Sequence, residues 1–316
     1  FDFSTRIYKD MTLYAEWNRT TDTSTWYKVT FNPQSGNCSI GSQYVESGDT
    51  VTRPNNPIKD GYTFDGWYTD TSYTQEFNFY TLIYSDTTLY AKWVEVFEYE
   101  LNDEGSAYEI IGYNGEETEI VLPQTYNSKP VTAIANAAFC NNTELTSVTI
   151  PSGITKIGAN AFRDCSRLTS VTIPSSVTNV GNNAFASSYS AAFTVNYLGT
   201  LNQWVQINFG NENSNPTSRT GKLIINGEEI TDVVVNNTAK ISDYAFYNCR
   251  NLTSVTIGNS VTTIGNAAFY GCIGLSSIII PNNVTSIGNN VFNGCSGLTS
   301  VSIGNNITTI SVYAFR

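Results

Sequence analysis

The chain has 316 residues, enough for about two or three domains, but only 14% of them are charged, against about 25% in an average soluble protein. There is no histidine, so His-based nucleophile pairs, His-ligated metal sites and the commonest general base at neutral pH are excluded. The net charge of -11 argues against nucleic acid or anionic lipid as a partner, because phosphate binding needs a surface rich in Lys and Arg.

Residues 1–18 and 77–94 share one pattern, because FDFSTRIYKDMTLYAEWN aligns without gaps with FNFYTLIYSDTTLYAKWV. We infer that a complete unit covers residues 27–94 and that residues 1–20 are the C-terminal remnant of a preceding copy. The alternation in YKVTF and TLYAKW predicts half-buried strands, with Asn-Pro, Ser-Gly and Asp-Gly turns between strands. We therefore expect a small, mostly β domain in a chain that is part of a longer protein.

Three segments of residues 27–94 are distinctive: VTFNPQSG, RPNNPIKDGYTFDGWYTD and FNFYTLIYSDTTLYAKW. The unit resembles the internalin-type B-repeat, also called the Listeria-Bacteroides repeat. The resemblance implies a β-grasp-like module that is strung in tandem along bacterial surface proteins. We interpret Trp67, Tyr90 and Trp93 as core aromatics and not as a ligand platform, because so small a domain has few other residues for its core.

Residues 95–119 carry nine carboxylates and no basic residue. We interpret this segment as the N-terminal cap of the repeat domain that follows, with an acidic outer surface. Calcium capture or docking to a basic partner is the alternative. It is disfavoured because no D-x-[DN]-x-[DN]-G loop is present and because charge runs usually mark a solvated face.

A second repeat, with a period of 23 residues, covers residues 118–316. Each unit contains Leu-x-x-Val-x-Ile, the strand of a leucine-rich repeat, whose apolar residues point inward while the residues between them face the concave surface. One coil cannot bury its own apolar face, so the coils must stack into a solenoid. An Ala-Phe or Val-Phe pair marks the units, at Phe139, Phe162, Phe185, Phe246, Phe269, Phe292 and Phe315.

The unit LTSVTIPSSVTNVGNNAF resembles the BspA-like leucine-rich repeat. The resemblance covers residues 118–316 apart from one insertion, and it implies a secreted or surface-attached bacterial protein that adheres to host proteins or other cells. Gly258 and Gly304 replace the Pro of other coils. The final coil stops at Arg316 without a cap, so we expect further coils or a capping segment in the full protein.

An insertion at about residues 186–240 breaks the period. Asn226-Gly227 predicts a hairpin turn between short apolar runs, and Leu201, Trp204 and Val205 would share one face of a short helix. The GT-x-x-x-W element and the INGE hairpin also resemble segments met in the BspA-like family. We predict an elaborated coil with Trp204 packed against the solenoid; an exposed Trp204, the alternative, would be an anchor for a partner.

Four cysteines stand three residues after a repeat Phe, whereas Cys38 and Cys140 lie outside this register. Neighbouring coils lie about 4.8 Å apart, but side chains in register point in parallel and fit the disulfide dihedral badly. We predict buried free thiols that act as small apolar fillers, with disulfides as the alternative. A zinc site is disfavoured because the four thiols do not converge on a tetrahedron. The four are Cys165, Cys249, Cys272 and Cys295.

The concave face is the candidate binding surface, because hydroxyls occupy nearly all of its outward positions. Cross-strand hydroxyl ladders also stabilise a parallel sheet by themselves, and the strip lacks the aromatic anchors that usually dominate affinity, so a purely structural role stays open. The candidate ligand-binding residues are Ser147, Thr149, Ser170, Thr172, Ser254, Thr256, Ser277, Ser300 and Ser302, with Trp204 as a further candidate; Ile279 interrupts the second row.

Residues 251–315 contain no charged residue, and the other carboxylates show no catalytic spacing. We therefore predict a non-enzymatic protein without cofactor or metal, and without membrane insertion because no run of about 18 apolar residues occurs. The favoured hypothesis is an extracellular, bacterial cell-surface adhesion protein. Its solenoid would bind a protein or glycan of a host or neighbouring cell, with the B-repeats as spacers. The alternative is a structural stalk or a self-associating surface-layer element without a specific host ligand.

Overall fold

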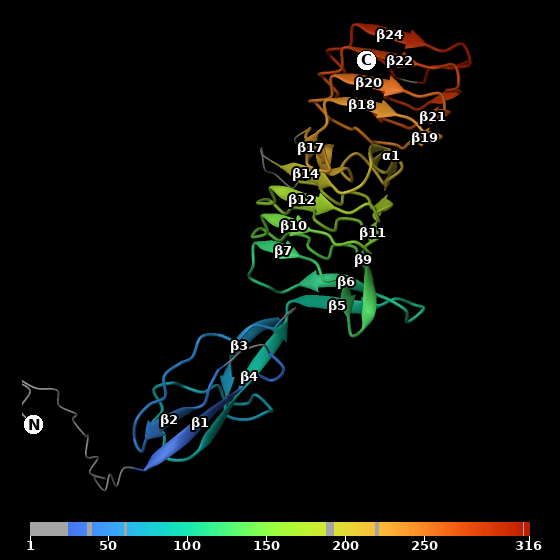
Figure 1. Ribbon diagram of the computed structural model, residues 1–316. Coiled ribbons are helices and arrows are strands. Elements are labelled where there is room, and N and C mark those ends of the chain that lie inside the picture. The colour runs from blue at the N-terminus through green and yellow to red at the C-terminus, as the bar shows by residue number, and fades with distance from the viewer. Residues whose placement is uncertain (1–24, 37–39, 60–61, 188–192, 219–220, 312) are drawn as a thin grey trace, which may run out of the picture. The chain divides into compact units, whose positions relative to one another are not determined.

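The computed structural model describes residues 25–36, 40–59, 62–187, 193–218, 221–311 and 313–316. Figure 1 shows a β-rich chain, as expected, with very little helix. Contacts divide it into two units, residues 1–94 and 95–316. The remnant assigned to residues 1–20 lies outside the described residues, and so does Cys38.

The first unit is a four-stranded mixed sheet of β1 (Trp26–Asn32), β2 (Gln43–Glu46), β3 (Tyr62–Tyr68) and β4 (Thr87–Glu95). Its order is β2-β1-β4-β3, with β1 parallel to β4 and antiparallel to β2. This arrangement agrees with the expected β-grasp-like module, although the described residues between β2 and β3 form loops and no helix.

Successive side chains of a strand point to opposite faces of the sheet, which places Phe31 of β1 and Leu89 of β4 in the core of the first unit. Trp67 is buried beside them, with its ring centroid 5.0 Å from that of Phe31. Trp93 packs against this core and donates a 2.9 Å hydrogen bond from Nε1 to the Pro33 carbonyl. Tyr90 is only half-buried and does not belong to the core, so its predicted role is wrong.

The second unit begins with the acidic segment, which forms β5 (Phe97–Leu101) and β6 (Tyr108–Tyr113). These strands pair antiparallel, and β5 is the edge strand of its sheet. Phe97 and Ile110 are buried in the same core as the coils, whereas Glu98 and Glu100 are exposed. The segment therefore has an apolar inner face and an acidic outer face.

Each coil then adds one strand of three or four residues to what we call the long-strand sheets, of which there are two among the described residues; the first also contains a two-residue hairpin strand, β17 (Glu228–Glu229). The strands of the first are β7 (Glu119–Val121), β10 (Ser147–Thr149), β12 (Ser170–Ile173), β14 (Thr194–Tyr197), β16 (Leu223–Ile225) and β17, in that spatial order. The strands of the second are β18 (Asp232–Val235), β20 (Ser254–Ile257), β22 (Ser277–Ile280) and β24 (Ser300–Ile303).

A second side of the coils carries strands that, apart from one of six residues, are two residues long. They are β8 (Thr125–Tyr126), β9 (Lys129–Ile134), β11 (Lys156–Ile157), β13 (Asn179–Val180) and β15 (Asn208–Phe209), which continue the sheet of β5 and β6, followed by β19 (Lys240–Ile241), β21 (Thr263–Ile264) and β23 (Ser286–Ile287). The loop that contains the repeat Phe forms the third side and leads back to the next long strand.

Parallel pairing in register explains why the coils stack. Val148 pairs with Val171, one period further on, and both are buried. The repeat phenylalanines form matching ladders; the rings of Phe139 and Phe162, for example, stack at 5.0 Å and 13°. The glycine that follows most of the short strands permits the close approach, since an added Cβ at Gly181 would lie 2.5 Å from the backbone of the previous coil.

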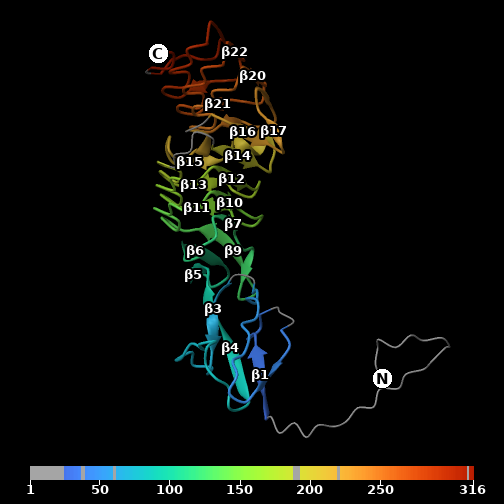
Figure 2. The ribbon, with the colours of Figure 1, turned by 90° about the vertical axis from the view of Figure 1, so that its left-hand side faces the viewer.

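The insertion interrupts the sheets but not the core. Its helix α1 (Leu201–Trp204) begins at Thr200 with a capping box completed by Gln203, and a 3-10 turn, η1, spans Pro216–Ser218. The predicted hairpin joins β16 and β17, with φ of 51° at Asn226 and 87° at Gly227. Figures 1 and 2 show the helix and the hairpin between two groups of coils. The first group carries the sheet of β7 to β17, and the second group, the C-terminal coils, carries the sheet of β18 to β24.

Candidate interaction surface

The structure places the predicted hydroxyl residues in two sheets and not on one continuous strip. Ser147 and Ser170 pair in the first long-strand sheet, and Ser254, Ser277 and Ser300 pair in the second. Because β17 runs antiparallel to β16, it ends the first sheet before β18 begins. The predicted hydroxyl rows are therefore divided between the two sheets.

The two sheets differ in how much of their hydroxyl rows reaches solvent. In the first sheet Ser147, Thr149, Ser170 and Thr172 are all half-buried. Ser170 donates to Ser147 across 2.9 Å, which is the self-supporting ladder considered from the sequence. In the second sheet the outward residues are exposed, namely Ser254, Thr256, Ser277, Ser300 and Ser302. The second sheet therefore offers the better surface to a partner.

Sequence reasoning missed the apolar members of this surface. Val234 pairs with Thr256 and Thr256 with Ile279, so the second outward row mixes aliphatic and hydroxyl side chains. Val234 is 55% exposed and Ile279 is 67% exposed. Residues 231–235, Thr-Asp-Val-Val-Val, have the spacing of Thr-Ser-Val-Thr-Ile and so carry the signal of a regular strand, although they lie within the bounds expected for the insertion.

Asp232 begins the first outward row of the second sheet. Hydrogen bonds from the Ser254, Thr231 and Thr253 side chains lower the pKa of its carboxyl group. These hydrogen bonds favour the charged form of the carboxyl group, which lies beside the hydroxyl row at the junction with the insertion.

Trp204 is not an exposed anchor. Its side chain is fully buried, and Nε1 donates a 2.8 Å hydrogen bond to the Ala245 carbonyl in the next coil. Its ring lies 5.2 Å from Tyr197 and 5.4 Å from Phe209, measured between centroids. The prediction that it packs against the solenoid is confirmed, and its place among the ligand-binding candidates is wrong.

The cysteines in the repeat register are buried and unpaired, as predicted. The structure adds a hydrogen bond for each thiol, which donates to a carbonyl of the previous coil. Cys165 Sγ lies 3.1 Å from the Phe139 oxygen, and Cys295 Sγ lies 3.0 Å from the Phe269 oxygen. Burial raises the pKa of Cys165 to about 12 and that of Cys295 to about 11. At neutral pH these thiols are protonated and act as core residues.

We expect these thiols to resist modification in the folded protein. In a variant in which Cys38 and Cys140 are replaced by Ser, a thiol reagent at about pH 8 should react at least a hundredfold more slowly than in denaturant, because the thiolate is the reactive form. Since the folded pKa exceeds an unfolded value of about 8.5, the thiols should also destabilise the fold progressively as pH rises from about 9 towards 11. Equal reaction rates in folded and unfolded protein would contradict this assignment.

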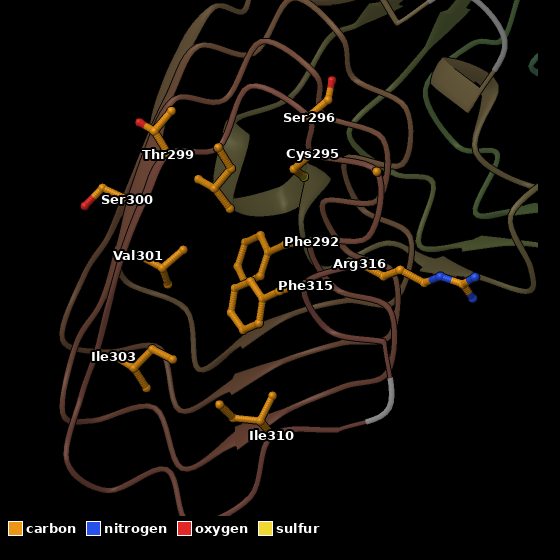
Figure 3. Close-up of a pocket in the computed structure, with 12 residues that line it drawn as sticks. Phe292, Cys295, Ser296, Thr299, Ser300, Val301, Ile303, Ile310, Phe315 and Arg316 are labelled. Carbon is orange, nitrogen blue, oxygen red and sulfur yellow. The ribbon is translucent and has the colours of Figure 1, made fainter.

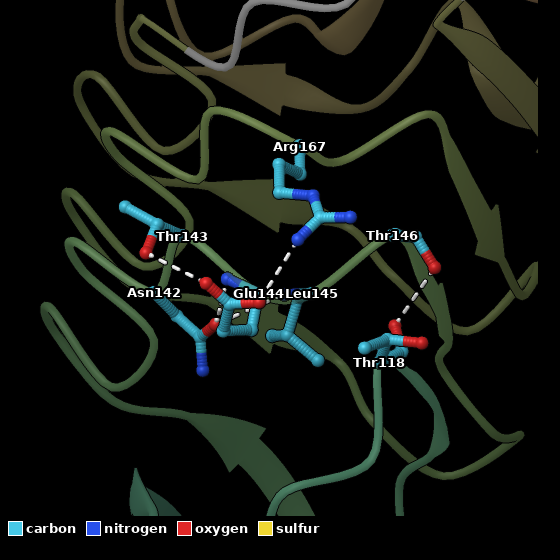
Figure 4. A network of polar contacts seen from close by, with 7 residues as sticks. All are labelled: Thr118, Asn142, Thr143, Glu144, Leu145, Thr146 and Arg167. Carbon is cyan, nitrogen blue, oxygen red and sulfur yellow. Dashed lines mark hydrogen bonds and ion pairs between the residues drawn. The ribbon is translucent and has the colours of Figure 1, made fainter.

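Polar contacts between coils support the first sheet. Figure 4 shows Glu144 and Arg167, one period apart, in an exposed ion pair at 2.9 Å, and Thr146 donating to the Thr118 carbonyl at 3.1 Å. Asn142 closes the local turn by accepting from the backbone of Glu144 and Leu145. The ion pair and the Thr146 hydrogen bond join neighbouring coils, whereas the Asn142 contacts stabilise a turn within one coil.

The acidic segment offers no assembled cation site in the part of the chain that the structure describes, where no group of three or more Asp, Glu, Cys or His residues could hold a metal ion. Its side chains have structural partners instead. Glu98 accepts from Asn114 at 2.7 Å, and Glu95 accepts from the Tyr126 hydroxyl at 2.8 Å.

Two family comparisons match this architecture. Residues 114–213 and 225–316, more than half of the chain, match the family described as the BspA type leucine rich repeat region, in six copies. The chain belongs to the BspA-type leucine-rich repeat family. Residues 27–92 match the Listeria-Bacteroides repeat domain, so both resemblances noted in the sequence are confirmed.

Two curated relatives come from Evansella cellulosilytica. A putative membrane protein is 34% identical over 111 residues, which are 34% of this chain and 16% of that protein. A putative Gly-rich membrane protein is 33% identical over 110 residues, which are 34% of this chain and 12% of that protein. The matched stretch is therefore a small part of each relative.

Two solved structures also resemble the chain. A leucine rich cell surface protein from Faecalibacterium prausnitzii is 30% identical, with a TM-score of 0.48, over 66% of this chain and 54% of that one. A leucine-rich repeat protein from Bacteroides ovatus is 26% identical, with a TM-score of 0.50, over 68% of this chain and 53% of that one. The chain thus spans about half the length of each.

Family membership indicates a protein-interaction or surface role for this BspA-type protein, and proteins of this kind are extracellular or surface-exposed scaffolds, typically without enzymatic activity. Within the residues that the structure describes, no helix has the length and apolar character needed to cross a membrane.

Proposed function

We propose that this chain is a non-enzymatic adhesion module of a bacterial surface protein, in which the second long-strand sheet contacts a protein of a host or neighbouring cell. The observation that carries the proposal is the exposure of that sheet, where Val234 and Ile279 stand among uncharged hydroxyl residues. Aliphatic side chains supply the area that binding needs, and hydroxyls satisfy polar groups of a partner at the rim.

The other parts of the chain would support this surface. The B-repeat of residues 27–94 would act as a spacer, and the acidic segment of residues 95–119 would cap the solenoid. In support, Phe97 and Ile110 cover the first coil while the glutamates of β5 face outward.

A binding assay with matched variants tests the proposal. The full chain is screened against immobilised matrix and cell-surface proteins, and Ile279→Asp is expected to weaken the binding found at least tenfold, because it puts a charge in the centre of the contact. Val121→Asp is the control, since Val121 is equally exposed, at 68%, in the corresponding row of the first sheet. It should bind within twofold of the unchanged chain.

Two results would contradict the proposal: no binding above background by the folded chain, or an equal loss in both variants. The second candidate function, a self-associating stalk, is favoured by residues 251–315, which contain no charged residue and so bring no charge repulsion between copies. Concentration-dependent assembly without a partner, measured by sedimentation, would support that function instead.

A further inference from the structure

A groove of about 460 Å³ lies on the third side of the C-terminal coils, away from both kinds of sheet. We call it the tyrosine groove and define it by Tyr244, Tyr247, Ala267, Tyr270, Asn290 and Tyr313. All six belong to the loops that contain the repeat Phe. Figure 3 shows that Arg316, which also lines this groove, points away from the side of the coil that carries Ser300. The groove is therefore separate from the long-strand sheets.

The groove exists because one coil has a small residue where its neighbours have larger ones. Tyr244, Ala267, Asn290 and Tyr313 follow one another at intervals of 23 residues and occupy the same position in successive coils. Ala267 lines the groove but is almost fully buried, so its methyl group forms the floor. The space above it is bordered by the larger side chains of the coils before and after.

The backbone at this position makes the tyrosines unusual. Every coil holds this residue in the left-handed region, with φ of 58° at Ala137 and 57° at Asn160 in the first group of coils. Asn tolerates this conformation, whereas it is rare for a bulky aromatic residue. Tyr244 and Tyr313 nevertheless adopt φ of 60° and 58°. Strained residues of this kind concentrate at ligand sites.

A second aromatic column stands beside the first. Tyr247 and Tyr270, one period apart, stack at 4.7 Å with an interplanar angle of 7°, and Tyr244 meets Tyr247 edge-on at 5.9 Å. The corresponding residues in the first group of coils are Cys140, Arg163 and Ala186, so this aromatic cluster is confined to the C-terminal coils.

Amide side chains complete the wall. Asn293 donates from Nδ2 to Asn290 Oδ1 at 3.2 Å, which holds both amides at the groove. The Asn289 side chain is exposed beside them, while its backbone NH donates to Asn266 Oδ1 at 2.8 Å. Each amide can both donate and accept hydrogen bonds, as a ligand hydroxyl does. The described lining carries charge only at Glu212 and Arg316.

We propose that the tyrosine groove binds a neutral oligosaccharide. A sugar ring presents an apolar CH face, which would pack on the tyrosine rings above Ala267, and a rim of hydroxyls, which would bond to Asn289 and Asn290. A polypeptide is the less suitable occupant, because it would need an open strand edge or a hydrophobic groove for its anchor residues, and this groove is walled by loops and amides. The site is independent of the protein-binding sheet proposed above.

The experiment measures binding of the full chain to immobilised neutral oligosaccharides of glucose, N-acetylglucosamine, galactose or mannose. Ala267→Tyr should abolish binding or weaken it at least tenfold, because a third tyrosine in the column fills the groove. Ala137→Tyr is the matched control, since it makes the same change in the same left-handed region, at φ of 58° against 50° at Ala267, in an exposed coil position outside the groove. Its affinity for the oligosaccharide should stay within twofold of that of the unchanged chain.

A second variant distinguishes loss of the binding site from misfolding of Ala267→Tyr. Tyr270→Ala removes a wall without adding bulk and should also weaken binding at least tenfold, with the circular dichroism spectrum unchanged. Ile279→Asp should leave sugar binding intact, which separates this site from the sheet. The proposal is overturned if no neutral oligosaccharide binds, if Ala267→Tyr binds as well as the unchanged chain, or if an immobilised peptide binds the groove and loses binding in Ala267→Tyr.

Discussion

Replacing Phe269 by Ala is expected to lower the free energy of unfolding of the second unit by about 3–5 kcal/mol, the usual cost of deleting a fully buried ring. Phe269 is fully buried and stacks between Phe246, at 5.2 Å, and Phe292, at 5.5 Å. The change removes the middle of a ladder, so both neighbouring rings lose a packing partner. Urea unfolding followed by circular dichroism measures the loss.

The control for Phe269→Ala is Ile279→Ala, which truncates a side chain that is 67% exposed in the next strand. It should change the free energy of unfolding by no more than about 0.5 kcal/mol. A loss below about 1 kcal/mol for Phe269→Ala would mean that the Phe ladder does not carry the stability of the C-terminal coils.

The register of the solenoid could be predicted from the sequence because the physical requirement repeats in every coil. A buried residue such as Val148 must pair with its counterpart Val171 in the next coil if the core is to be continuous, and the interval of 23 residues predicts that pairing directly. The insertion has no such periodicity. Its helix and hairpin were visible as local patterns, but the end of the first sheet at β17 depends on how the hairpin meets the next coil.

The candidate surfaces were less predictable for two different reasons. Exposure of the hydroxyl rows is a property of the assembled sheets, and the same Ser-x-Thr spacing is half-buried at Ser170 and exposed at Ser254. The tyrosine groove depends on a left-handed loop position and on the missing side chain at Ala267. Its traces in the sequence are the replacement of Asn by Tyr at positions 244 and 313, two residues before the repeat Phe, and the Tyr that follows the repeat Phe at positions 247 and 270.

Trp204→Ala should have the second large effect. We expect it to lower the free energy of unfolding by about 3–5 kcal/mol and to change the cooperativity of unfolding. Trp204 connects the two groups of coils, since it packs on Tyr197 and Phe209 of the first and bonds to the Ala245 carbonyl of the second. The long-strand sheets are interrupted here, so side-chain packing and a few hydrogen bonds must transmit stability across the junction. We expect unfolding of the second unit to separate into two transitions.

Trp204→Phe distinguishes packing from hydrogen bonding at this junction. Phe retains much of the apolar contact and removes only the Nε1 donor, while the Ala245 carbonyl keeps a second donor in Asn215 Nδ2 at 3.0 Å. Trp204→Phe should therefore lower the free energy of unfolding by less than Trp204→Ala does. The lost hydrogen bond accounts for about 0.5–1.5 kcal/mol, to which the lost packing adds, and a single unfolding transition should be preserved.

Hydrogen exchange at β12 and β22 measures both groups of coils in one experiment. Equal protection in the two groups for Trp204→Ala would show that the backbone bond between Ser242 and Val205, at 2.8 Å, and the remaining core couple them without the indole.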